Sequence, residues 1–168
     1  WAIPGTAGLE HRIGGLEKAD GSGNISYDPE NHDHMVRLRQ AKVDAIADTI
    51  PDIEVDDPGG DARILMLGWG STYGPIGAAC QIVRRSGVKV AHAHLRHLNP
   101  FPRNLGEVLA SYERVVVPEM NLGQLNMLLR SKFLIDTYGY NQVRGLPFKS
   151  SELVDVIREI SEQMEESS

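Results

Sequence analysis

Cysteine is nearly absent from this sequence: Cys80 is the only one in 168 residues. One thiol excludes an internal disulfide framework, and it cannot supply a cysteine-rich zinc or iron–sulfur site on this chain. Because Cys80 falls on the apolar side of a predicted helix, we expect a small core residue rather than a nucleophile. A reducing cytoplasm is the compartment that fits this cysteine usage.

Long apolar runs and concentrated basic charge are also missing. No apolar stretch approaches the roughly 18–20 residues that a membrane-spanning helix needs. The formal net charge is −6 and no dense basic cluster occurs, so a nucleic-acid partner is disfavoured, because binding phosphates needs a concentrated basic surface. Gly-x-Ser-x-Gly is absent as well, which leaves hydrolase chemistry without its nucleophile. The chain begins with Trp1 rather than Met, and we expect it to be a C-terminal piece of a longer polypeptide.

The first third of the sequence is rich in turn formers. Residues 1–30 are rich in glycine. Within them, residues 11–16 and 24–27 are predicted to form the two arms of a loose hairpin. Asp28 as N-cap and Pro29 at the first helical position predict a helix that Pro51 stops. The acidic, turn-rich stretch 54–61 follows and indicates a boundary. We therefore expect an interdomain segment over residues 1–59 and a separate domain over residues 60–168.

Strand and helix patterns alternate through residues 60–168. Strands are predicted at 63–67, 88–93, 114–117 and 140–143, and helices at 75–86, 104–112, 122–133 and 151–164. Strands separated by helices of this length favour a mostly parallel sheet with helices on both faces. The predicted fold class is a three-layer α/β/α domain.

A glycine-rich turn follows the first strand of this domain. Its sequence, GWGSTYG at 68–74, is one residue longer than the dinucleotide fingerprint, and no acidic residue follows the next strand to hold a ribose. An independent dinucleotide site is therefore disfavoured. Two interpretations stay open: the small residues let the helix pack close to the sheet, or the turn faces a partner domain. The candidate cleft or interface residues here are Gly68, Gly70, Ser71 and Thr72.

Histidines and one carboxylate mark the ends of the next two strands. His92 and His94 should point to the same face of their strand, and His97 follows. No acidic residue or cysteine nearby completes a metal-ligand set, so we expect no metal, and one of these histidines could relay a proton at an interface. Glu119 lies just past the third strand, where it could orient a neighbouring group or accept a backbone hydrogen bond. His97 and Glu119 complete the set of candidate cleft or interface residues.

Six motifs spread along the chain resemble the α subunit of 2-oxoacid:ferredoxin oxidoreductases. The motifs are PGTAGLEH at 4–11, DPENH at 28–32, RQAK at 39–42, GWGST at 68–72, HLNPFP at 97–102 and VVVPEMNLGQL at 115–125. The resemblance covers essentially the whole chain, its last motif is the most specific, and the 2-oxoglutarate enzymes are the nearest members. It implies a domain like the transketolase C-terminal domain, with a mostly parallel five-stranded sheet.

The resemblance also implies an activity for the full enzyme. Such enzymes use thiamine diphosphate, Mg²⁺ and an iron–sulfur cluster to convert a 2-oxoacid and coenzyme A to acyl-CoA, CO₂ and reduced ferredoxin. The implied partners are the upstream domains of the same subunit, the β subunit, ferredoxin and coenzyme A. The family's Tyr-Pro-Ile-Thr-Pro motif lies in the preceding domain and is absent here, and the resemblance places the cofactor and cluster ligands on the β subunit.

We therefore expect no catalytic or cofactor-binding residue on this fragment, which would be inactive alone. Its role would be to support assembly and to form one wall of the active-site cleft. Two alternatives stay open: an independent module that binds a nucleotide or coenzyme A, and a purely structural dimerisation domain.

Overall fold

The structure, a computed structural model, describes residues 2–11 and 14–166. Contacts divide the chain into two units, Trp1–Ala45 and Ile46–Ser168. Part of the hairpin arm expected at 11–16 lies outside the described residues, because positions 12 and 13 are not among them. No helix within the described residues is both long and apolar enough to span a membrane.

Polar contacts organise the first unit. Its helix α1 (Pro29–Asp44) begins as the sequence predicts, with the Asp28 side chain accepting a hydrogen bond from the Glu30 amide and Pro29 in the first turn. No α1 residue is buried. Glu17 instead forms ion pairs with His32 and Arg39 of this helix. The preceding turn, closed by a bridge between residues 18 and 25, is thus held to α1 by charge rather than by an apolar core.

The second unit contains the strands and the remaining helices. A short 3-10 segment, η1 (Ala45–Thr49), joins α1 to this unit, and a second, η2 (Gly70–Thr72), precedes α2. The elements in chain order are β1 (Val55–Asp56), β2 (Ile64–Trp69), α2 (Tyr73–Arg85), β3 (Val90–Leu95), α3 (Leu105–Ala110), β4 (Arg114–Glu119), α4 (Gln124–Phe133), β5 (Thr137–Asn141) and α5 (Ser150–Glu166). The strands form one five-stranded sheet in the order β1-β3-β2-β4-β5.

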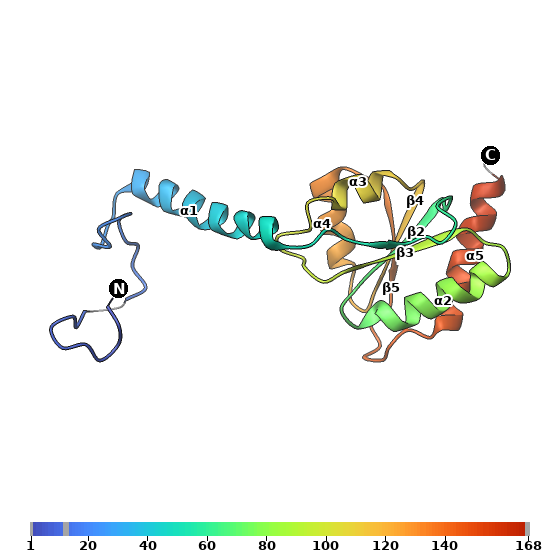
Figure 1. Cartoon of the computed structure of the whole chain (residues 1–168), viewed down its shortest axis with the longest axis horizontal. Helices are drawn as coiled ribbons and strands as arrows, with labels where there is room; N and C mark the ends of the chain where they lie inside the picture. Colours follow the sequence, from blue (N-terminus) through green and yellow to red (C-terminus); the bar gives the residue numbers. More distant parts are fainter. Residues whose placement is uncertain (1, 12–13, 167–168) are drawn as a thin grey trace. The chain divides into compact units, whose positions relative to one another are not determined.

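Four of the five strands are parallel, and helices cover both faces of the sheet. Strands β2, β3, β4 and β5 pair in parallel, whereas β1 pairs with β3 in the antiparallel direction. Figure 1 shows α2 and α5 on one side of the sheet and α3 and α4 on the other. Side chains alternate between the two faces along each strand: Met66 packs in the core beneath α2 and α5, and its neighbour Leu67 packs in the core beneath α3 and α4. This arrangement confirms the predicted fold class.

The boundary between the units differs from the expected division at 59/60. Residues 54–61 were expected to be a linker, but Val55 and Asp56 pair with Ala93 and His92 of β3. Arg84 of α2 holds this short strand, bonding the Asp56 carboxylate at 2.7 Å and the Asp56 carbonyl oxygen at 2.5 Å. The segment therefore belongs to the α/β unit, of which it forms one sheet edge.

Candidate functional site

The glycine turn lies where β2 ends and α2 begins. A Cβ on Gly68 would lie 2.7 Å from Ile76 Cδ1 and 2.8 Å from Thr72 Oγ1, so a larger residue here would displace these side chains where the helix packs on the sheet. Gly70 has a φ of +59° and open space around it, so it is needed for its left-handed backbone rather than for close packing. The two glycines therefore have different physical roles in the same turn.

The two hydroxyl residues of the turn also differ. Thr72 Oγ1 donates to the Trp69 carbonyl oxygen at 2.9 Å and accepts from the Trp69 amide at 3.1 Å, and its residue is 3% exposed. Its hydroxyl is thus occupied in closing the turn. Ser71 is exposed and stays a candidate for contact with a partner.

Glu119 is fully buried at the end of β4, where it caps helix α4. Its Oε1 accepts from the Leu125 amide at 2.9 Å, and its Oε2 accepts from the Asn126 amide at 2.9 Å. The residue before this helix is Gly123, which has no side chain to act as a cap. Glu119 performs that function from the neighbouring strand, with its negative charge at the positive end of the helix dipole.

Asn121 and Trp69 complete the network around Glu119. Asn121 Oδ1 accepts from the amides of Gly123 at 2.7 Å and Gln124 at 3.1 Å, while its Nδ2 donates to Glu119 Oε1 at 3.1 Å. Trp69 Nε1 also donates to Glu119 Oε1, at 3.3 Å. The first amides of α4 are therefore all satisfied, and β2 is tied to β4. The motif at 115–125 therefore has a structural role: its Glu119 accepts hydrogen bonds from backbone amides.

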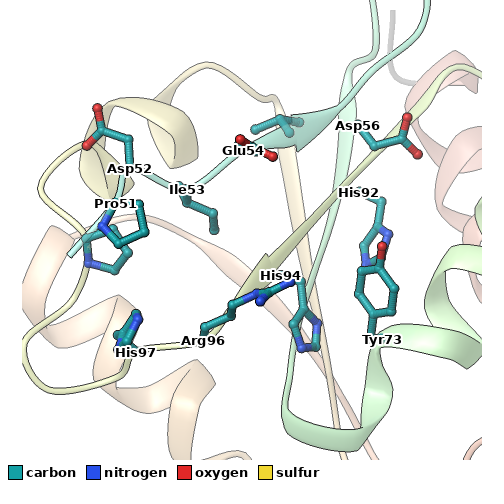
Figure 2. A pocket seen from close by; sticks show the side chains of 12 residues that line it. Pro51, Asp52, Ile53, Glu54, Asp56, Tyr73, His92, His94, Arg96 and His97 are labelled. Carbon is teal, nitrogen blue, oxygen red and sulfur yellow. The ribbon is translucent and has the colours of Figure 1, made fainter.

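A cavity of about 610 Å³ lies on the other side of the sheet's centre from Glu119, between β1, β3 and the start of α2. His92 and His94 line it from β3, Tyr73 lines it from α2, and Arg96 and His97 follow β3 at its rim (Figure 2). The segment that leads into β1 forms the remaining wall, with residues 51–56. Of the six candidate cleft or interface residues from the sequence, one, His97, lines this cavity, together with the strand histidines His92 and His94.

The two strand histidines lie on the same face of β3, as the sequence predicts. Their ring centroids are 6.3 Å apart, and the Tyr73 ring lies 5.3 Å from His92 and 5.0 Å from His94. They face α2 because Val90, which precedes them in the same alternation, packs in the core beneath that helix. The His92 ring lies against α2 near Gly77, where an added Cβ would make only an ordinary contact with it at 3.7 Å.

Both histidines are held in the neutral form. Burial, helped by the neighbouring His94, lowers the pKa of His92 to about 4. Burial also lowers the pKa of His94, although a hydrogen bond to the Gly70 backbone partly opposes that decrease. Two ring nitrogens, His92 Nε2 and His94 Nδ1, are buried without a hydrogen-bond partner among the described residues.

Sequence reasoning identified the histidine pair but not the cavity. Tyr73 was missed, although its position at the start of a helix after a strand-end turn is a usable signal. The wall at 51–56 could not be anticipated from a segment that resembles a linker. The described residues contain no group of three or more histidine, cysteine, aspartate or glutamate side chains that could hold a metal ion. Cys80, with no exposed surface, does not fit an iron–sulfur cluster.

Comparisons with known proteins agree with this architecture. A family model described as pyruvate:ferredoxin oxidoreductase core domain II matches residues 62–144. The 2-oxoglutarate oxidoreductase subunit KorA of Mycobacterium tuberculosis is 64% identical over 158 residues, which is 94% of this chain and 24% of that protein. The α subunit of 2-oxoacid:ferredoxin oxidoreductase 2 from Aeropyrum pernix is 36% identical over 159 residues, 92% of this chain and 25% of that protein.

A solved structure shows the same fold. The 2-oxoglutarate:ferredoxin oxidoreductase from Magnetococcus marinus, with 2-oxoglutarate, coenzyme A and succinyl-CoA bound, superposes with a TM-score of 0.85 and 33% identity. The match covers 95% of this chain and 28% of that one. The fold and these relatives define an α/β domain of an oxidoreductase subunit. The chain belongs to the 2-oxoacid:ferredoxin oxidoreductase α-subunit family, which confirms the resemblance seen in its motifs, and it spans about a quarter of the length of these relatives.

Proposed function

We propose that this chain is the domain of a 2-oxoglutarate:ferredoxin oxidoreductase α subunit that supports subunit assembly and forms one wall of the active-site cleft. The observation that supports this role is the capping network of Glu119. It fixes the ends of β2 and β4 and the start of α4 with groups that are all satisfied internally. Such an edge is rigid and offers no reactive carboxylate.

The reactive groups of the full enzyme would lie outside this chain. Thiamine diphosphate supplies an electron sink for the decarboxylated 2-oxoacid when it is bound, and iron–sulfur chemistry would pass the electrons to ferredoxin. Cys80 is buried, and the described residues contain no group of three or more histidine, cysteine, aspartate or glutamate side chains that could hold a metal ion. The β subunit and the other α-subunit domains would hold both cofactors and bring coenzyme A to the cleft.

An activity assay with two arms tests this proposal. The isolated chain should show no 2-oxoglutarate-dependent reduction of ferredoxin in the presence of coenzyme A, and turnover would overturn the proposed inactivity. The parent α subunit that contains this chain should be active when co-expressed with its β subunit, with a higher kcat/KM for 2-oxoglutarate than for pyruvate. A preference for pyruvate would contradict the proposed substrate.

Ser71 gives the assembly role its own test. Because Ser71 is exposed beside an internally bonded turn, Ser71→Arg should weaken co-purification of the two subunits while leaving the fold of this chain intact. Glu113→Arg, on an exposed side chain next to the start of β4, is the matched control and should have no effect. Equal recovery of the β subunit with both variants would contradict a contact at the turn.

A further inference from the structure

The most unusual polar atoms in the described structure are the unpartnered imidazole nitrogens of β3. His92 is 5% exposed and its Nε2 has no hydrogen-bond partner, and the same holds for His94 Nδ1 nearby. A buried polar group without a hydrogen-bond partner destabilises the folded state. The fold does not need these groups, because Val90 occupies the same face of the same strand with an apolar side chain. The two nitrogens therefore indicate a partner that is not part of this chain.

The neutral form of the two rings determines what they can offer. His94 Nδ1 has no hydrogen-bond partner among the described residues. A neutral imidazole carries one N–H donor and one lone-pair nitrogen, so the His94 ring offers an acceptor that needs a donor. His92 stays neutral at physiological pH, so one of its nitrogens is likewise an acceptor.

The opposite wall of the cavity is acidic and fixed in place. Asn104 bonds both the amide and the carbonyl oxygen of Ile53, at 2.9 and 3.0 Å, and Arg84 holds Asp56 at the other end. Glu54 lies between these anchors and Asp52 directly precedes them, and both residues line the cavity (Figure 2). Neither carboxylate has an ion-pair partner in the described part of the chain. They lie on a wall that the fold has already ordered, so a ligand would not need to organise it.

These groups together match one kind of ligand. The cavity offers imidazole lone pairs, two carboxylates without ion pairs and the ring of Tyr73, which can interact with a cation through its face. An anion would be repelled by the two carboxylates, and Arg96 is the one arginine or lysine that lines the cavity. We propose that the cavity between β1, β3 and α2 binds a hydrogen-bond-donating cation, a guanidinium or ammonium group, with His92 and Glu54 as its main acceptors.

Two sources supply this chemistry: a free guanidino or amino compound, or an arginine or lysine side chain of a polypeptide that contacts this edge of the sheet. The volume of about 610 Å³ accommodates either. The inference is independent of the proposed function, because it uses only groups that this chain contains.

The test is an NMR titration of the full 168-residue chain with its histidine rings isotopically labelled. Methylguanidinium is the small probe, an arginine-centred tripeptide is the polypeptide probe, and inorganic phosphate and succinate are the anionic controls. The cations should shift the ring signals of His92 and His94 saturably, with a Kd of about 1–10 mM for methylguanidinium. A tripeptide that binds at least about tenfold more tightly would identify a side chain as the source, and equal affinities would identify a small molecule.

Variants make the test specific. His92→Phe keeps an aromatic ring but removes the acceptor, and should abolish the shift of His94. Glu54→Gln should weaken binding a few-fold without changing the fold. Arg96→Ala should strengthen it, because this substitution removes a cation from the rim, whereas at an anion site it would weaken binding. His32→Phe, in the other unit, is the control and should change nothing.

The proposal is overturned by any of three results: no saturable shift with either cation, a response to phosphate or succinate but not to the cations, or unchanged binding in both His92→Phe and Glu54→Gln. The second result would establish an anion site in its place. Because Glu54 is exposed, its variant should fold even where the replacement of His92 does not.

Discussion

Replacing Glu119 with glutamine tests the network that joins β2, β4 and α4. The substitution preserves the shape of the side chain and removes its charge. The new amide nitrogen must occupy the position of either Oε1, which accepts three hydrogen bonds, or Oε2, which accepts one from the Asn126 amide. The second orientation is less costly, so the loss falls on Asn126, whose N–H would face another donor.

The magnitude follows from these contacts. An orphaned buried amide costs about 1–3 kcal/mol. Loss of the negative charge at the helix start costs about 0.3–1 kcal/mol more, and the three remaining bonds lose their charge assistance. We therefore expect the free energy of unfolding to decrease by about 2–4 kcal/mol. For a unit of this size, that corresponds to a decrease in Tm of roughly 10 °C.

Urea unfolding followed by tryptophan fluorescence measures this effect, because Trp69 donates to Glu119 directly. Glu113→Gln is the matched control: its carboxylate is 57% exposed and pairs with Arg63 on the surface, so its loss should cost under about 1 kcal/mol. If the two variants were equally stable, the buried carboxylate would not be the cap that the geometry indicates.

Three further substitutions give independent checks. Gly70→Val should destabilise the chain by about 1–2 kcal/mol, because φ is +59° there, whereas Gly74→Ala, in open space within α2, should be neutral or slightly stabilising in the same thermal scan. Burial lowers the pKa of His92 to about 4; His94 and Arg84 also oppose its protonation, whereas Asp56 favours it. The unfolded chain therefore binds the proton more tightly than the folded chain. The stability of the parent relative to His92→Phe should decrease by about 1–2 kcal/mol as the pH falls from about 6.5 to about 4, with water in the cavity screening part of the full effect; a difference independent of pH would contradict this. Burial raises the pKa of Cys80 to about 12, so a thiol reagent should modify it only after unfolding, and modification of the native chain would show that the thiol is accessible.

The order of elements in the α/β unit could be predicted from the sequence because each element has a strong local signal. Helix α2 buries Ile76, Ala79, Cys80 and Val83, the stripe expected from its periodicity, and Gly87 ends it with a φ of +93°. Strand β1 had no such signal. Its two residues gain their structure from pairing with β3 and from Arg84, contacts between segments far apart in the chain.

The candidate site was predictable only in part, for the same reason. The glycine turn and the strand-end position of Glu119 are local patterns, and the cap could have been inferred from a glutamate and an asparagine that precede a helix without an N-cap side chain. The cavity depends on residues 51–56 folding back along β3, so its acidic wall is visible only in three dimensions. Of the small residues expected to let the helix pack close to the sheet, Gly68 has this role, whereas a Cβ at position 70 would meet nothing within 4 Å.

The two halves of this sheet edge differ in how completely their polar groups are paired, and that difference indicates where external contacts occur. At β4 and α4, one carboxylate and one asparagine satisfy every amide at the helix start. At β3 and α2, the turn closes on itself through Thr72, yet two imidazole nitrogens are buried with no partner among the described residues, beside carboxylates that form no ion pair with those residues. Buried polar groups in folded proteins are normally hydrogen-bonded. Because the groups at β4 and α4 are fully paired, the unpaired groups at β3 and α2 are not explained by the stability of the fold. The open half, rather than the glycine turn or Glu119, is therefore where a ligand or a neighbouring polypeptide gains most by binding.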